Sequence, residues 1–254
     1  MRIALAQLRA TTDPLQNLDQ VVDALREASR RGSHVVVLPE AMMCSFLRPG
    51  AEVAEPLDGA WATAVRDAAA ELKVTVVVGM FTTAADGRIH NTLLVTGQAE
   101  DSYDKIHLFD ALGQRESDGI APGDRLVDVD VLGQRFGLGI CYDIRFPTHF
   151  LELASRGAGI MVVCASWAPG PGKLHQWRTL ATARAMDSTS FVIAVDQAAA
   201  EGDRDGVPTG IGHSMVVDPS GWVLLELGEG PELAIVDIDP ARIGAVRGAL
   251  PIIP

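Results

Sequence analysis

The chain has 254 residues, of which 48% are hydrophobic and 21% are charged, as in ordinary folded globular proteins. Its 21 basic and 33 acidic residues give a net charge of −12, which argues against nucleic acid or an anionic membrane as a partner, since both bind basic surfaces. The apolar runs fall far short of the about 20 residues that a membrane-spanning helix needs, and the first residues lack the pattern of a signal peptide. We therefore expect a cytoplasmic protein that folds as one domain over residues 1–254.

Short apolar, β-rich runs alternate with helical patterns in the first half of the chain. The apolar spacing predicts helices at 15–31, after the start signal Asp13-Pro14, and at 61–72. Strands are predicted at 3–8, 34–38 and 74–80. Residues 91–96 and 101–106 are predicted to form a pair of strands that turns at Gly97.

The second half of the chain repeats this alternation and then ends in consecutive strands. Helices are predicted at 148–156 and 174–186, and a short one after Asp239-Pro240. Strands are predicted at 135–140, 159–164, 191–195, 213–217, 222–226 and 233–238. Apolar strands that alternate with helices indicate sheets covered by helices, and the final strands indicate antiparallel additions to those sheets.

The cysteines and histidines do not follow the spacing of a metal site or a disulfide framework. Cys44, Cys141 and Cys164 include no CxxC pair, and the six histidines include no HxxxH motif. The glycines of the segment GPGKLH lack the spacing of a phosphate-binding loop. We expect no metal and no cofactor, and we interpret Cys44 as structural.

The segment GICYDIRFP, residues 139–147, carries the strongest candidate nucleophile. A glycine-containing strand leads directly into Cys141, and a turn and a helix follow, which is the geometry that exposes a nucleophile at a tight turn. Such a turn also directs backbone N–H groups towards the space where an oxyanion would form. A single cysteine at the end of a strand is, however, more often buried structural filler.

Two further segments carry charged residues close to predicted strands. Glu40 ends VVVLPE, directly after a buried strand, and Lys105 lies in YDKIHLFD near the end of another. The loops at the ends of such strands commonly carry functional side chains in α/β proteins. Taken singly, each residue is also typical of a solvated surface.

In combination, LPE, YDKIHLFD and GICYDIRFP resemble the motifs of the nitrilase superfamily of carbon–nitrogen hydrolases. The order Glu40, Lys105, Cys141 is similar to that of the family's catalytic residues, and ESDGIAPGD places Glu116 as its second active-site glutamate. The resemblance continues through ARAMDS and GHSMVVDPSG and therefore covers nearly the whole chain. It is closest to the branch of ω-amidases and deaminated-glutathione amidases.

The resemblance implies an α/β fold, a four-layer α-β-β-α sandwich whose members commonly form homodimers or larger oligomers. It implies an amidase that converts a small ω-carboxamide to a carboxylic acid and ammonia through a thioester on Cys141, without a cofactor. Glu40 would move the protons and Lys105 would stabilise the oxyanion, with the Tyr142 backbone N–H as a second donor. Glu116 would hold Lys105 in place.

Several further residues are candidates for binding the substrate. Ser166 and Trp167 follow the strand that Cys164 ends, and we expect them to line the pocket. Arg145 could meet a substrate carboxylate, although helix capping or an interface ion pair would explain it equally well.

The chain departs from the branch at two places that bear on the substrate. Gln176, expected at the border of the pocket, begins Gln-Trp-Arg where the branch often has His-Trp-Glu. Thr148 follows Phe-Pro where the branch often has glutamate. The identity of the amide therefore stays open.

Two alternatives compete with the amidase interpretation. The same Glu-Lys-Cys site could act on a nitrile or an N-carbamoyl compound. A non-catalytic binding protein on this fold would have lost one of the core residues, and none is lost here.

Overall fold

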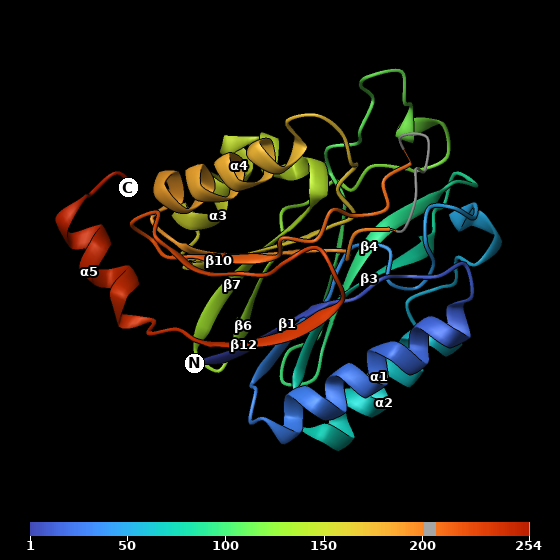
Figure 1. Ribbon diagram of the computed structural model, residues 1–254, viewed down its shortest axis with the longest axis horizontal. Coiled ribbons are helices and arrows are strands. Elements are labelled where there is room, and N and C mark those ends of the chain that lie inside the picture. The colour runs from blue at the N-terminus through green and yellow to red at the C-terminus, as the bar shows by residue number, and fades with distance from the viewer. Residues whose placement is uncertain (201–206, 254) are drawn as a thin grey trace.

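The structure, a computed structural model, describes residues 1–200 and 207–253. Two six-stranded sheets lie face to face, and helices cover the outer face of each sheet (Figure 1). This arrangement is the four-layer α-β-β-α sandwich, so the predicted fold class is confirmed.

The first sheet has the strand order β12-β1-β2-β3-β4-β5. Its three central strands run parallel to one another: β1 (Arg2–Gln7), β2 (Val35–Val37) and β3 (Thr75–Thr83). The antiparallel strands at its sides are β12 (Glu232–Asp237), β4 (Ile89–Thr96) and β5 (Asp101–Asp104). The predicted pairing of the two strands around Gly97 is confirmed.

The second sheet has the strand order β11-β10-β9-β8-β7-β6. Its parallel centre is formed by β7 (Gln134–Ile140), β8 (Ile160–Ala165) and β9 (Phe191–Asp196). The antiparallel strands are β6 (Asp128–Val131), β10 (Met215–Val217) and β11 (Val223–Glu226). The antiparallel additions predicted from the C-terminal strands are thus present in both sheets.

The helices begin and end at the signals in the sequence. Helix α1 (Pro14–Arg30) starts where the Asp13 carboxylate accepts a hydrogen bond from the Leu15 N–H, and it is followed by Gly32 in the left-handed conformation, with φ of +76°. The other helices are α2 (Ala60–Leu72), α3 (Pro147–Ser155), α4 (Lys173–Ser188) and α5 (Ala241–Ala249). Across residues 1–200 and 207–253, no helix has both the length and the apolar character needed to cross a membrane.

Apolar residues on both faces of the central strands build three core layers. In β1, Ile3 and Leu5 point into the layer between the sheets, whereas Ala4 and Ala6 face α1 and α2. A corresponding layer lies between the second sheet and the helices α3 and α4. Because successive side chains of a strand alternate between its faces, strands buried on both faces read as continuous apolar runs in the sequence.

One strand was not predicted. In β6, Val129 and Val131 face the layer between the sheets, while Asp128 and Asp130 lie on the other face of this edge strand. The alternation of Asp and Val over four residues is the pattern of a strand buried on one face only. The predicted strand at 101–106 is shorter than expected, because β5 ends at Asp104.

The close approach of two backbone segments depends on Gly79 in β3. A Cβ atom at this position would lie 2.4 Å from the Ala41 nitrogen and 2.6 Å from the Glu40 Cα. Any side chain on residue 79 would therefore push the turn after β2 away from the sheet.

We expect Gly79→Ala to lower the free energy of unfolding by about 1–3 kcal/mol, the usual cost of overpacking a filled interior. Gly244→Ala is the matched control, because nothing lies within 4 Å of a Cβ at that position in α5. The control should be neutral or slightly stabilising, since alanine favours helix over glycine. Urea denaturation of both variants measures the difference, and equal stabilities would contradict the packing argument.

Candidate active site

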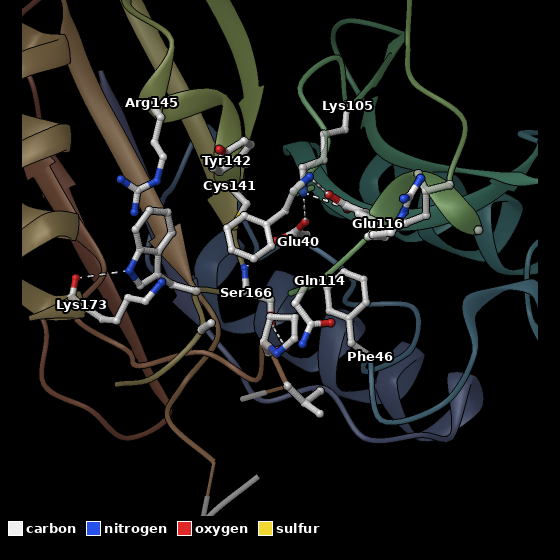
Figure 2. Close-up of a pocket in the computed structure, with 18 residues that line it drawn as sticks. Glu40, Phe46, Lys105, Gln114, Glu116, Cys141, Tyr142, Arg145, Ser166 and Lys173 are labelled. Atoms are coloured by element: carbon white, nitrogen blue, oxygen red, sulfur yellow. Dashed lines mark hydrogen bonds and ion pairs between the residues drawn. The ribbon is translucent and has the colours of Figure 1, made fainter. Parts of the chain in front are cut away.

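A cavity of about 400 Å³ opens at the carboxyl ends of the central strands of both sheets. Glu40 and Lys105, which follow β2 and β5 of the first sheet, line it together with Cys141, which follows β7 of the second. Figure 2 shows these side chains converging, with Glu116 beside Lys105. Ligand sites in α/β proteins commonly lie at such strand ends.

The Cys141 turn is strained and is held by the side chain of Asp143. Cys141 begins the 3₁₀ turn Cys141–Arg145 with φ of +45°, a left-handed conformation that non-glycine residues seldom adopt. Asp143 Oδ2 accepts a hydrogen bond of 2.8 Å from the Ile140 N–H, and Asp143 Oδ1 accepts one of 3.0 Å from the His107 N–H. A single buried carboxylate thus joins the nucleophile turn to the segment after Lys105.

Asp143 keeps its negative charge although it is fully buried. Burial by itself would raise the pKa of this carboxyl group, but hydrogen bonds from the His107 side chain, the Ile140 N–H and the Tyr103 hydroxyl, together with the nearby His149, lower it below its ordinary value of 3.8. The charge therefore stays available to the N–H groups that fix the turn.

Glu40 is 1% exposed and accepts hydrogen bonds on both of its carboxylate oxygens. Its Oε1 lies 2.7 Å from Asn91 Nδ2 and 3.2 Å from Lys105 Nζ. Its Oε2 accepts a hydrogen bond of 2.7 Å from the Ser166 backbone N–H. The carboxylate is thus held rigidly in the cavity wall.

Lys105 lies between two glutamates. Its Nζ is 2.9 Å from Glu116 Oε1 and 3.2 Å from Glu40 Oε1 (Figure 2). Glu116 Oε2 in turn accepts a hydrogen bond of 2.6 Å from the Phe109 N–H. The predicted contact between Glu116 and Lys105 is therefore present.

The charges of the site favour a neutral thiol next to a carboxylate that can accept its proton. Burial and the negative charge of Glu40 raise the pKa of Cys141 well above its ordinary value of 9.0, and Lys105 opposes them only in part. Burial also raises the pKa of Glu40 above 4.5, against the attraction of Lys105. Burial alone would lower the pKa of Lys105, but the negative charges of Glu116 and Glu40 have the larger effect and raise this pKa well above 10.5. The Lys105 side chain therefore stays protonated.

The opposite wall of the cavity is cationic and aromatic. The Arg145 guanidinium lies 5.1 Å from the centre of the Trp167 ring, and Lys173 Nζ lies 5.8 Å from the same ring and from that of Phe109. Burial, followed by repulsion from Arg145, lowers the pKa of Lys173. Figure 2 shows Arg145 and Lys173 on the other side of Cys141 from Lys105.

Four of the five predicted substrate-binding residues line the cavity: Tyr142, Arg145, Ser166 and Trp167. Gln176 is not among the residues that line the cavity, and its Oε1 accepts a hydrogen bond of 2.6 Å from Arg145 Nη2. The expectation that Gln176 borders the pocket is therefore corrected: it supports a residue that does.

The rest of the Gln-Trp-Arg segment also has structural partners. Trp177 is fully buried and donates from its indole to the His213 carbonyl, and Arg178 forms an ion pair of 2.7 Å with Glu226 on β11. Thr148, the second departure from the branch, is exposed near the start of α3.

The sequence analysis did not identify several residues of the site or its support, and three of them are instructive. Asn91 interrupts the apolar strand β4, which is a signal that could have found it, since a buried amide needs partners. Gln197 is buried directly after β9 and donates a hydrogen bond of 2.8 Å to the Glu40 carbonyl. The sequence around Lys173 carries no signal like the one at Asn91, because the position of Lys173 at the cavity depends on the path of the loop before α4.

The other cysteines and the histidines take structural positions. Cys44 and Cys164 are buried free thiols. His107, Asp143 and His149 bring three potential ligand atoms within 4.8 Å of one another, a grouping that the sequence spacing did not predict. His107 Nδ1 lies 2.7 Å from Asp143 Oδ1 and His149 Nε2 lies 2.8 Å from the Leu138 carbonyl, so hydrogen bonds to protein atoms account for the orientation of both rings.

Comparison with known proteins relates the chain to a set of hydrolases. Hydrolase Rv0480c of Mycobacterium tuberculosis is 48% identical, with 100% of this chain and 94% of that protein covered. The deaminated glutathione amidase of Escherichia coli O157:H7 is 30% identical, covering 100% and 96%. Omega-amidase NIT3 of Saccharomyces cerevisiae is also 30% identical, covering 99% and 91%.

Two solved structures share the fold. Saccharomyces cerevisiae Nit3, a member of branch 10 of the nitrilase superfamily, superposes with a TM-score of 0.87 at 28% identity, covering 100% of this chain and 95% of that one. A glutamate-to-glutamine mutant of the amidase from Nesterenkonia sp. AN1, with acrylamide added to its active-site cysteine, gives a TM-score of 0.80 at 27% identity, with 98% of each chain covered. Residues 2–248 match the carbon-nitrogen hydrolase family. The chain therefore belongs to the carbon–nitrogen hydrolases of the nitrilase superfamily.

Proposed function

We propose that this protein is an amidase that hydrolyses a small ω-carboxamide bearing a carboxylate to a carboxylic acid and ammonia, through a thioester on Cys141. The observation that carries the proposal is one cavity with Cys141, Glu40, Lys105 and Glu116 on one side and two cations on the other. The acrylamide adduct on the cysteine of the Nesterenkonia amidase supports a cysteine nucleophile.

In the first half of the reaction, Cys141 Sγ attacks the carbonyl carbon of the amide while Glu40 accepts the thiol proton. The pKa shifts support this coupled transfer, because a thiol with a raised pKa is neutral at pH 7 and needs a base at the moment of attack. Negative charge that develops on the carbonyl oxygen is stabilised by the Lys105 ammonium and the Tyr142 backbone N–H. The C–N bond then breaks, Glu40 returns its proton to nitrogen, and ammonia leaves.

In the second half, water attacks the thioester and gives its proton to Glu40. The same two donors stabilise the second oxyanion. The C–S bond breaks, the carboxylic acid leaves, and the proton on Glu40 returns to the Cys141 sulfur. Glu116 keeps Lys105 in position through both halves by its 2.9 Å ion pair.

The carboxylate of the substrate is assigned from the opposite wall. Within the part of the chain that the structure describes, neither Arg145 nor Lys173 forms an ion pair, and both face the cavity. Partly desolvated cations without an acidic partner attract an anionic ligand group. A carboxylate between them would place the amide at the far end of the substrate, next to Cys141.

The experiment that tests this function is ammonia release from a panel of small amides, nitriles and N-carbamoyl compounds. Glutaramate represents the expected class, and 5-methylhexanamide, in which an isopropyl group replaces the carboxylate, is its neutral counterpart. Preferential turnover of a nitrile or of an N-carbamoyl compound would favour one of the alternatives.

The formation of a homodimer by this protein stays a prediction from the resemblance.

We expect Cys141→Ser to release ammonia at least about 10³-fold more slowly than the wild type, because the hydroxyl is a poor replacement for the nucleophilic sulfur in this geometry. Circular dichroism should show an unchanged fold. Near-normal turnover by Cys141→Ser would contradict the assignment of the nucleophile.

We expect kcat/KM to fall as the pH drops through the pKa of Glu40, because only the ionised carboxylate can accept the thiol proton. Burial raises that pKa, so the acidic limb of the profile should have its midpoint above the ordinary value of 4.5. The profile is measured over the range in which near-UV circular dichroism shows folded protein. A midpoint at or below 4.5 would argue against a buried general base.

We expect Lys173→Met to lower kcat/KM for glutaramate by about 10–100-fold, mainly through KM, because a hydrogen bond to a charged group contributes about 1.5–3 kcal/mol. Methionine keeps an unbranched side chain of similar length without the charge, so turnover of 5-methylhexanamide should not change. The control is Lys73→Met, an exposed lysine at the end of α2. Equal losses on both amides would contradict the carboxylate site.

A further inference from the structure

The two residues proposed to exchange the proton come from different sheets. Glu40 follows β2 of the first sheet, and Cys141 follows β7 of the second. The distance between the carboxylate and the thiol therefore depends on how the sheets are joined at this end. Catalytic groups must be held within a few tenths of an ångström of their productive geometry, so the residues that join the sheets here matter for the rate.

Gln197 joins the two sheets beside Glu40. It follows β9 of the second sheet, is 1% exposed, and its own N–H donates to the Ala165 carbonyl. Its side chain reaches the first sheet: Nε2 donates to the Glu40 carbonyl at 2.8 Å, and Oε1 accepts from the Ala10 N–H at 3.1 Å. One amide thus fixes two backbone segments of the opposite sheet.

The backbone that Gln197 holds is the strained turn that carries Glu40. Ala41 has φ of +55°, in the left-handed region that non-glycine residues seldom occupy. The turn also packs against Gly79 so tightly that a Cβ on that glycine would collide with it. Such a conformation persists only where the surroundings hold it, and Gln197 supplies a hydrogen bond at this point.

Asp196, the residue before Gln197, binds the backbone segment that donates a hydrogen bond to the Glu40 carboxylate. Its Oδ1 accepts a hydrogen bond of 2.7 Å from the Trp167 N–H, and its Oδ2 accepts one of 2.7 Å from the Ile211 N–H. The preceding amide, the Ser166 N–H, donates to Glu40 Oε2 at 2.7 Å. Two consecutive N–H groups of this segment thus donate to the two acids, Ser166 to Glu40 and Trp167 to Asp196.

We propose that Asp196 and Gln197 are positioning residues that hold Glu40 from both ends against Cys141. Gln197 holds the backbone carbonyl of Glu40, and Asp196 holds the Trp167 N–H, the neighbour of the Ser166 N–H that donates to the Glu40 carboxylate. This inference rests on the proposed roles of Glu40 and Cys141. Neither residue lines the cavity, so their loss should lower kcat more than it raises KM.

The first test compares Gln197→Met with Gln7→Met. Gln7 is equally buried, donates from Nε2 to the Gly228 carbonyl and accepts from the Ser214 N–H, but forms no hydrogen bond with Glu40. We expect Gln197→Met to lower kcat for glutaramate at least tenfold while KM changes less than threefold. Both variants should lose thermal stability, and Gln7→Met should keep wild-type kcat per folded molecule.

The second test uses Asp196→Asn and its matched control Asp218→Asn. Asp218 is also buried and accepts backbone N–H groups, those of Ser220 and Trp222, in the turn between β10 and β11. An asparagine at 196 can no longer accept from both Trp167 and Ile211, so kcat should fall at least tenfold. Asp218→Asn should alter stability alone.

Alkylation of Cys141 by iodoacetamide, followed by intact mass, supplies a readout that does not depend on the natural substrate. The variants at 196 and 197 should react at least tenfold more slowly per folded molecule than the wild type and the two controls. If folded Gln197→Met or Asp196→Asn shows the alkylation rate and the kcat of the wild type, the proposal is wrong. Losses of equal size in the two control variants would also overturn it. If the wild type hydrolyses no amide but the alkylation rates still separate, the proposed function fails and the positioning role stands.

Discussion

The docking of two apolar sheet faces against each other brings the ends of β2 and β7 to a single cavity. Residues such as Leu5 and Val37 of the first sheet and Ile140 and Val162 of the second share one buried layer. Burial of this much apolar surface is the dominant favourable contribution to folding. The site takes Glu40 from one sheet and Cys141 from the other, so its geometry exists only when this layer is formed.

The same packing places charged groups where water cannot solvate them freely. The buried Glu40 and Lys105 form a chain of charges with Glu116, which is partly buried. Each glutamate also accepts a backbone N–H, Glu40 from Ser166 and Glu116 from Phe109. Ionised groups are tolerated in such places only when they are paired and hydrogen-bonded. Here the pairing secures the Lys105 charge, while burial keeps the Cys141 thiol neutral and raises the proton affinity of Glu40.

One of the two departures from the branch, the Gln-Trp-Arg segment, contacts the cationic wall. Gln176 holds Arg145, and Arg178 is directed away to Glu226 on β11. The wall thus carries Arg145 and Lys173 over the Trp167 ring. The Gln-Trp-Arg segment, one of the two departures from the branch, therefore supports the cationic wall through Gln176.

The sequence by itself determined the elements and the catalytic set. Apolar periodicity, the Asp13 cap and the left-handed Gly32 placed most strands and helices within one to three residues, because these signals act over a few neighbouring residues. Motif order identified Glu40, Lys105, Glu116 and Cys141, which the fold brings together. The edge strand β6 also carries a local pattern, the alternation of Asp and Val.

Only the tertiary structure decided which distant residues support that set. Lys173, Asn91, Asp196 and Gln197 are far from Cys141 in the chain, and their partners are backbone groups and rings of other segments. The place of Gln176 behind Arg145 was likewise decided there. The physical reason is that a local pattern specifies which face of an element is buried, whereas the partner of a buried polar group depends on which other segment the folded chain brings against it.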